Sequence, residues 1–388
     1  MFYFFIGGMF RSGTTLLGRM LHAHPELVCA SDPCLPLFKF LRSLLAQQVE
    51  LDIPPQHPLQ DYYYDVNLLK LFKLIQKSSL NESIPKEWIP AIKNEIKRYG
   101  EPYSPLIMPY LNRVSGESFA DLLRQILEII REVYGKNTEK FVGFKEVWGD
   151  EFIPAMARTF PEMKFIILVR DPRAVAASKN ITQEKYPWLF LARQWRKLAA
   201  LAWYYAHNEE LMERVLVLRF EDLISDPLKT AKKICMHLGV SFHPEMLNPE
   251  RYVDGFGKPW RQNTSYGNGA KGFDQKAISR WQKVLSNNEK LLIELVCGPE
   301  MFLHGYLESF SYKALPELLR NFPEISLEER ADWIAPLFPP DGLSERVNLS
   351  QEALREALLT ASFPPSNEVL SGAFLFPEIW EKAKEGMI

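Results

Sequence analysis

The chain opens with a short apolar run, Phe2 to Ile6, and a glycine-rich turn separates this run from apolar residues that recur at helical spacing over 16–21. A continuous apolar run bounded by turn residues is typical of a buried strand. Glycines such as Gly8 and Gly13 let the backbone curl so that its N–H groups point inward. The pattern predicts a strand, an anion-binding turn and a helix that begins near Thr14, with the positive end of its dipole toward the turn.

From residue 141 onward, apolar strands alternate with helical patterns. The predicted strands and the helices between them are listed in chain order: strand 141–147, helix 152–160, strand 164–169, helices 172–180 and 188–214, strand 215–220 and helix 228–238. Repeated strand–helix–strand units favour a parallel sheet with helices on both faces. The expected fold class is therefore α/β, a three-layer sandwich around a central parallel sheet.

Residues 34–135 form a mostly helical insert with proline-rich links, which we expect on the acceptor side of the site. Its predicted helices are 35–48, 66–77, 86–98 and 117–133. Residues 244–275 contain five glycines and Pro259 and predict a long loop, and loops of this length in enzymes are often functional. The last residues show no strand alternation. We expect a catalytic domain over 1–310 and a small helical appendage over 311–388.

The charge, the cysteine content and the apolar runs of the chain limit which partners and compartments are expected. A formal charge of −2 and a pI near 6.4 provide no general attraction to nucleic acid or to an anionic membrane, so neither is an expected partner. Four scattered cysteines without metal-ligand spacing indicate reduced thiols and a cytoplasmic protein. No run approaches the roughly 18 apolar residues of a membrane span. Because the chain begins directly on a strand without a basic leader, we expect a domain of a longer protein.

The turn has the spacing of a Walker loop, G-x-x-x-x-G-K-[ST], over Gly8 to Thr15. Thr14 occupies the position of the lysine, however, and the only cation of the loop is Arg11. A kinase or ATPase would lack the lysine that holds the β and γ phosphates. The site is therefore P-loop-like, and it favours a different phosphate-containing ligand.

A second candidate anion site follows the apolar strand 164–169. Arg170 stands directly after the strand, within R-D-P-R, and Ser178 lies eight residues later on the next predicted helix. The carboxyl ends of parallel strands are where α/β sheets bind ligands. A guanidinium and a hydroxyl could hold one phosphate there.

The two motifs together resemble the sulfotransferases that use 3′-phosphoadenosine 5′-phosphosulfate (PAPS). R-S-G-T-T resembles their 5′-phosphosulfate loop, and R-D-P-R with its serine resembles their 3′-phosphate motif. L-R-F-E-D-L over 218–223 and the helices over 280–306 also resemble the family. The resemblance covers residues 2–307, is weak in the insert and is absent from the tail. Because Leu16 replaces a tryptophan of the cytosolic branch, the chain is more similar to the bacterial and tyrosylprotein branches.

The resemblance implies the following binding residues. The residues that would hold the 5′-phosphosulfate are Arg11, Ser12, Gly13, Thr14 and Thr15. Arg170 and Ser178 would hold the 3′-phosphate. Phe220 stands where relatives often have a tyrosine against the adenine. Trp260 and Arg261 begin a string, W-R-Q-N, that resembles part of a second 3′-phosphate loop.

The implied reaction moves a sulfuryl group to a hydroxyl and releases 3′,5′-bisphosphoadenosine (PAP). Arg11 and Lys145 are the candidate cations at the breaking bond, because such transfers depend on positioned positive charge. Asp32 is the candidate base, since it stands near the position of a glutamate base in the tyrosylprotein branch. His22 and His24 are rival bases.

Glu146, which follows Lys145, is a further candidate base. No metal is expected, because the protein supplies the cations. The acceptor is expected to be a small molecule, a lipid or a carrier-bound acyl chain, since the insert is apolar and aromatic, and the chain would serve as a domain or partner of a larger biosynthetic protein. A P-loop kinase or hydrolase and a catalytically silent nucleotide-binding scaffold are the alternatives.

Overall fold

A computed structural model describes the chain except for residues 179–185, 262, 264–270, 323–331 and 338–344. The chain divides into two compact units. The sheet unit comprises 1–56, 73–169 and 208–275, and the helical unit comprises 57–72, 170–207 and 276–388. The predicted division near residue 311 stays a prediction.

Five strands form one sheet in the sheet unit, in the spatial order β2-β3-β1-β4-β5. Every neighbouring pair is parallel. The strands are β1 (Phe2–Gly7), β2 (Leu27–Ser31), β3 (Phe141–Lys145), β4 (Lys164–Val169) and β5 (Val215–Arg219). Strands β2 and β3 are buried along their whole length, as expected for a parallel sheet that is covered on both faces.

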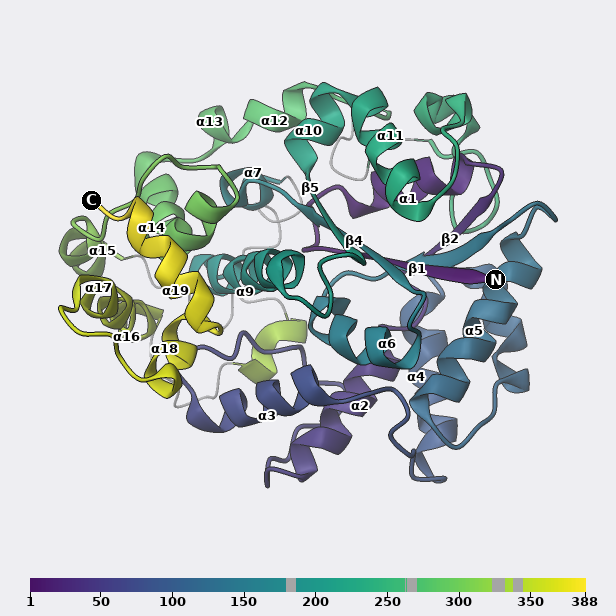
Figure 1. Cartoon of the computed structure of the whole chain (residues 1–388), viewed down its shortest axis with the longest axis horizontal. Helices are drawn as coiled ribbons and strands as arrows, with labels where there is room; N and C mark the ends of the chain where they lie inside the picture. The colour runs from purple at the N-terminus through teal and green to yellow at the C-terminus, as the bar shows by residue number, and fades with distance from the viewer. Residues whose placement is uncertain (179–185, 262, 264–270, 323–331, 338–344) are drawn as a thin grey trace. The chain divides into compact units, whose positions relative to one another are not determined.

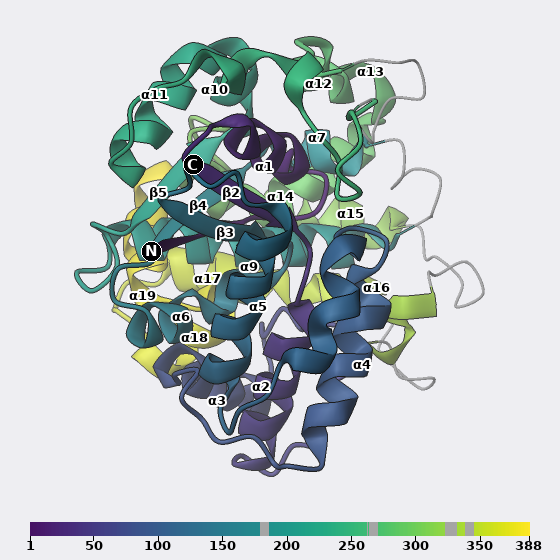
Figure 2. The same cartoon turned by 90° about the vertical axis from the view of Figure 1, so that its right-hand side faces the viewer.

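Helices cover both faces of this sheet (Figures 1 and 2). Helices α1 (Thr14–Ala23), α10 (Phe220–Ser225) and α11 (Pro227–Leu238) lie on one face, and α5 (Phe119–Tyr134) and α6 (Ile153–Thr159) lie on the other. The connections that follow β1 and β3 therefore run on opposite faces, and the strand order reverses beside β1. Open α/β sheets bind ligands in the crevice at such a point. The predicted α/β sandwich is confirmed.

The insert contains the predicted helices with shifted ends. They are α2 (Leu35–Gln47), α3 (Val66–Lys77), α4 (Trp88–Gly100) and α5. A capping box starts α5, in which the Ser118 hydroxyl accepts from the Asp121 N–H at 3.2 Å. The 3₁₀ helix η1 (Pro105–Arg113) was not predicted, because its two prolines suggested only a break. Shorter 3₁₀ turns are η2 (Gly149–Phe152), η3 (Pro244–Leu247) and η4 (Pro249–Arg251).

In the helical unit, the long helix α9 (Trp188–His207) packs against α14 (Asn287–Leu303). Helix α9 ends seven residues earlier than predicted, because the Asn208 side chain accepts from the Glu210 N–H at 3.0 Å and turns the chain. The remaining elements are α7 (Pro172–Ala176), α12 (Lys276–Ser279), α13 (Trp281–Val284), α15 (Leu315–Asn321), η6 (Asp332–Leu337), α16 (Glu345–Ser350), α17 (Glu352–Thr360), α18 (Asn367–Phe374), α19 (Pro377–Ala383) and η7 (Lys384–Gly386).

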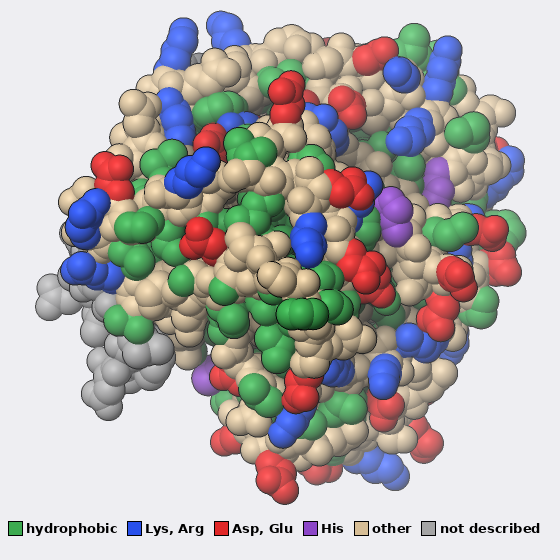
Figure 3. All heavy atoms as spheres, turned by 60° about the vertical axis from the view of Figure 1, so that its left-hand side comes forward, with side chains coloured by type: hydrophobic (Ala, Val, Ile, Leu, Met, Phe, Trp, Pro, Cys, Tyr) green, Lys and Arg blue, Asp and Glu red, His purple; other side chains and the backbone are tan. Residues whose placement is uncertain are grey.

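Surface charge is mixed. On the face in Figure 3, acidic and basic side chains are interspersed, in keeping with the formal charge of −2. All four cysteines are buried free thiols. Within the described part of the chain, no helix has both the length and the apolar character needed to cross a membrane.

Candidate nucleotide and transfer site

The turn between β1 and α1 has a backbone that only glycine accommodates at two positions. Gly8 has φ +131° and Gly13 has φ +92°. A Cβ atom on Gly8 would lie 2.5 Å from the carbonyl oxygen of Leu168, and one on Gly13 would lie 2.4 Å from the Phe220 ring. Arg11 also adopts a positive φ, of 67°. The turn is therefore curled tightly against β4 and α10, as its glycines predicted.

The turn has the features of an anion site. Ser12 is buried, and among the described residues its hydroxyl oxygen has no hydrogen-bond partner. Thr14 is buried at the first position of α1, and the first turn of that helix contains no acidic residue. Buried polar groups without a partner are uncommon, and the helix dipole favours negative charge at this end. A phosphate or sulfate group would supply the acceptor oxygens that these groups can use.

A buried carboxylate holds the entry to the turn, and sequence reasoning missed it. The Gly8 N–H donates to Asp150 Oδ2 at 3.0 Å, and Asp150 is fully buried in η2. The only signal for Asp150 was an acidic residue a few positions after the carboxyl end of β3. Asp150 fixes the backbone where the strand becomes the loop.

Sheet register brings two predicted catalytic residues together. Lys145, the last residue of β3, pairs in register with Ile6 of β1 and with Ser31 of β2. Asp32 follows Ser31, and its carboxylate forms a buried ion pair with the Lys145 ammonium. The other carboxylate oxygen of Asp32 accepts from the Val147 N–H at 3.2 Å. Both side chains therefore lie at the carboxyl ends of the strands, where the turn leaves β1.

Glu146 is a buried acid beside this pair. Its carboxyl group accepts from the Cys34 N–H and from the Tyr99 hydroxyl, each at 2.9 Å. Burial and the nearby negative charge of Asp32 raise the pKa of Glu146 well above its usual range. The neutral form of this carboxyl group is therefore favoured more than in an ordinary glutamate. No sequence pattern pointed to Tyr99.

The two rival histidines are buried and bonded to the backbone. His24 Nδ1 accepts from the Glu26 N–H at 3.0 Å, and its Nε2 lies 2.7 Å from the carbonyl oxygen of Ser241. His22 Nδ1 accepts from the Cys29 N–H at 3.2 Å. Burial, helped by the Lys136 charge, lowers the pKa of His22 to about 3. Burial also lowers the pKa of His24. These contacts are structural.

The other predicted residues of the sheet unit lie in different surroundings. Phe220, at the start of α10, is buried with its ring over Gly13. Trp260 is buried, and its ring centroid is 5.9 Å from that of Tyr252. Arg261 is exposed. The residue that follows it, Gln262, lies outside the described residues.

Arg170 and Ser178 belong to the helical unit. Arg170 directly follows β4 in the chain, and its guanidinium donates to the Ala277 carbonyl at 2.7 Å. The Trp195 indole N–H donates to the Arg170 carbonyl at 2.7 Å, which fixes this backbone. Ser178 is buried two residues after α7.

The second arginine of R-D-P-R has a structural role. Arg173 forms ion pairs with Asp171 and Glu294, each at 2.7 Å, and its guanidinium lies 4.0 Å from the centroid of the Trp281 ring.

Within the described residues, no group of three or more His, Cys, Asp or Glu side chains could hold a metal ion.

Comparisons with known proteins point to one family. A model of the sulfotransferase family matches residues 4–244. Carbohydrate sulfotransferase 3 of Tetronarce californica is 26% identical over 212 aligned residues, and the match covers 47% of this chain and 44% of that protein. The match therefore spans less than half of that relative.

Two solved structures are similar at low identity. The sulfotransferase domain from the Synechococcus PCC 7002 olefin synthase is 20% identical with a TM-score of 0.45, over 74% of this chain and 89% of that chain. The sulfotransferase domain from the curacin biosynthetic pathway is 19% identical with a TM-score of 0.42, over 75% of this chain and 95% of that chain.

Proposed function

The chain belongs to the sulfotransferase family, and we propose that it transfers the sulfuryl group of PAPS to a hydroxyl group and releases PAP. The observation that carries this proposal is the glycine turn after β1, with the buried Ser12 hydroxyl and with Lys145 on the neighbouring strand β3. Lys145, on the strand next to β1, could supply positive charge at the sulfur–oxygen bond of the 5′-phosphosulfate, which is the bond that breaks. A Walker lysine, which a kinase needs, is absent from the loop.

The donor would be held at two ends. The N–H groups and hydroxyls of residues 11–15 would bind the 5′-phosphosulfate, as the curled backbone and the start of α1 support. Arg170 and Ser178 would bind the 3′-phosphate, a group that ATP lacks. Support for Arg170 comes from its position directly after β4 and from a backbone fixed by Trp195. Phe220, Trp260 and Arg261 stay candidate nucleotide contacts.

The reaction would be an in-line displacement at sulfur. The acceptor oxygen forms a bond to sulfur while the bond between sulfur and the bridging oxygen breaks, and the electron pair leaves on the phosphate of PAP. An ammonium group has three N–H donors, and one N–H of Lys145 donates to the Asp32 carboxylate. The others could stabilise the charge that develops on the bridging oxygen, together with Arg11.

Asp32 would take the proton of the acceptor hydroxyl. Three observations support Asp32 over its rivals: the carboxyl group of Glu146 has a raised pKa and already accepts from the Cys34 N–H and the Tyr99 hydroxyl, and the two histidines are engaged with the backbone. General-base help of this kind is worth about 10²- to 10⁴-fold in rate. Asp32→Asn should therefore lower the rate of sulfate transfer by about that factor while PAP still binds.

Thermal-shift titration tests the donor assignment. PAP should stabilise the protein without Mg²⁺, and ATP with Mg²⁺ should do so much less. Arg170→Ala should abolish the stabilisation by PAP, and Arg320→Ala, at an exposed arginine of α15, should leave it unchanged. Stabilisation by PAP that survives in Arg170→Ala would show that the 3′-phosphate is bound elsewhere. Stabilisation only by ATP with Mg²⁺ would favour a kinase or hydrolase.

The acceptor would be a hydroxylated small molecule, a lipid or a carrier-bound acyl chain. Support comes from the apolar and aromatic composition of residues 34–135. A panel of these acceptors with labelled PAPS tests this class, and transfer confined to protein tyrosines would contradict it. Absence of transfer to any acceptor, with PAP bound, would favour the silent scaffold.

A further inference from the structure

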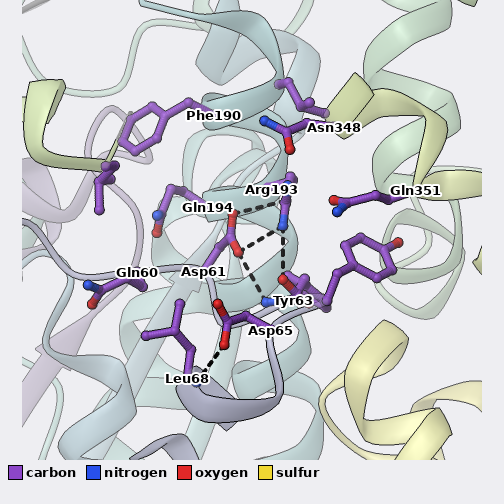
Figure 4. A pocket seen from close by; sticks show the side chains of 13 residues that line it. Gln60, Asp61, Tyr63, Asp65, Leu68, Phe190, Arg193, Gln194, Asn348 and Gln351 are labelled. Carbon is purple, nitrogen blue, oxygen red and sulfur yellow. Dashed lines mark hydrogen bonds and ion pairs between the residues drawn. The ribbon is translucent and has the colours of Figure 1, made fainter. Parts of the chain in front are cut away.

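The helical unit contains a cavity of about 370 Å³, and none of the residues assigned above is among its lining residues (Figure 4). Its walls come from the segment 60–68, from α9, and from Leu337, Asn348 and Gln351. The volume lies within the range of roughly 300–1,000 Å³ that small-molecule sites occupy. All of its lining residues belong to the same unit.

The charged groups of this cavity already have partners. Arg193 forms an ion pair with Asp61, with an Nε to Oδ2 distance of 2.9 Å, and it also donates to the Tyr63 carbonyl at 3.1 Å. Asp65 accepts from the Leu68 N–H at 3.0 Å at the start of α3. One arginine and two aspartates among the lining residues leave a formal charge of −1. An anionic ligand is therefore disfavoured.

Buried amide oxygens in the wall have no donor. Gln194 is only 1% exposed, and its amide nitrogen donates to the Leu59 carbonyl at 3.1 Å, which fixes the side chain. Among the described residues, the amide oxygens of Gln194 and Gln60 have no hydrogen-bond partner. Most buried polar groups have one, so these oxygens indicate a ligand or water that donates hydrogen bonds.

The rest of the wall suits the same kind of ligand. In Figure 4 the amide groups of Asn348 and Gln351 lie on the side of the Arg193–Asp61 pair opposite Gln60. An amide group both donates and accepts, as a hydroxyl group does. Phe190 adds an aromatic surface to the wall, on which the apolar face of a ring can pack.

We propose that this cavity binds a neutral, hydroxyl-rich molecule such as a pyranose sugar or a cyclic polyol. Hydroxyl hydrogens satisfy the amide oxygens of Gln60 and Gln194, and hydroxyl oxygens accept from the amide groups of Asn348 and Gln351. The formal charge of −1 disfavours phosphate and sulfate groups at this site. The inference does not rest on sulfuryl transfer, and PAP binding is measured separately.

Ligand-observed NMR by saturation transfer tests the proposal with the full chain. The probes are glucose, galactose and myo-inositol, with spermidine and inorganic sulfate as charged comparisons. At least one hydroxylated probe should bind in the ~1 mM range, the weak end of specific binding. Gln194→Met should weaken that binding roughly three- to tenfold, which is the loss of about one hydrogen bond.

Two further variants make the result decisive. Gln351→Leu changes the wall without touching the Gln194–Leu59 bond and should weaken binding by a similar factor. Gln282→Met, at an exposed glutamine of the same unit, should leave binding unchanged. The proposal is overturned if no hydroxylated probe binds, if spermidine or sulfate binds more tightly than all three, or if neither wall variant weakens binding.

Discussion

The helical unit contains two arginine–glutamate pairs whose side chains have no exposed surface. Arg196 of α9 donates to Glu352 of α17 at 2.7 Å, and Arg355 of α17 donates to Glu300 of α14 at 2.6 Å. Burial alone would lower the pKa of Arg196, but the Glu352 carboxylate keeps it well above its usual range, so the arginine stays charged. These pairs fasten the predicted appendage to α9 and α14.

Glu352→Ala removes the nearest counter-charge of a buried guanidinium. Removing one partner of a buried ion pair costs about 3–5 kcal/mol of unfolding free energy, because the other charge stays buried and uncompensated. Replacing both partners by apolar residues of similar volume is often neutral. The double variant Arg196→Met with Glu352→Leu should therefore be more stable than Glu352→Ala alone.

A surface pair provides the matched control. Lys382 and Glu385 are also 2.6 Å apart, but their side chains are 50% and 57% exposed. Solvent screens such a pair, and its loss costs about 0–1 kcal/mol. Glu352→Ala and Glu385→Ala therefore remove a carboxylate at nearly the same distance from its cation, and they differ chiefly in burial.

Urea unfolding followed by circular dichroism measures the difference. With a slope of about 3 kcal/mol per M, Glu352→Ala should lower the unfolding midpoint by roughly 1–2 M. Glu385→Ala should lower it by less than about 0.3 M. Equal midpoints for the two variants, with unchanged slopes, would refute the reasoning. Deletion of residues 311–388 should destabilise the remaining chain for the same reason.

Three further predictions concern the sheet unit. Gly13→Ala should weaken PAP binding by roughly tenfold in calorimetry, because a Cβ atom would lie 2.4 Å from the Phe220 ring at a positive φ. The pKa of His22 is lowered to about 3 in the folded state, so only the unfolded state binds a proton on this histidine as the pH falls below 6.5. Urea unfolding should therefore show that the free energy of unfolding falls by up to ~1.4 kcal/mol per pH unit. The fall should be weaker in His22→Gln. Glu146 has a raised pKa, so the folded state keeps a proton that the unfolded state loses as the pH rises above about 4.5. The free energy of unfolding should therefore fall as the pH rises above that value, and Glu146→Gln should remove this fall in the same assay.

The alternation of strands and helices was predictable because it depends on local patterns. The parallel strands are buried on both faces and stand out as continuous apolar runs, such as 164–169. Helix ends that depend on one side chain were less predictable, as the end of α9 at His207 shows. In α14, the helix continues through Pro299, although a proline inside a helix usually ends or kinks it.

The site was predictable where its residues share one loop and not where they meet through the sheet. The spacing over Gly8 to Thr15 is enough by itself to indicate the turn. The contact of Asp32 with Lys145 joins residues 113 positions apart, and it depends on β2 lying next to β3. Strand order follows from the packing of the whole sheet, so local sequence could not show it. Asp150 was missed for the same reason.

Register explains how the loop can function without its own lysine. Lys145 pairs with Ile6, two residues before Gly8, and a Cβ atom on Gly18 of α1 would lie 3.7 Å from the Lys145 Cβ. The lysine side chain therefore leaves β3 on the face that α1 covers, beside the middle of that helix. If it serves as the cation, its pairing with Asp32 couples that cation to the proposed base. Lys145→Met should then reduce transfer at least as much as Asp32→Asn, and a smaller loss would argue against this coupling.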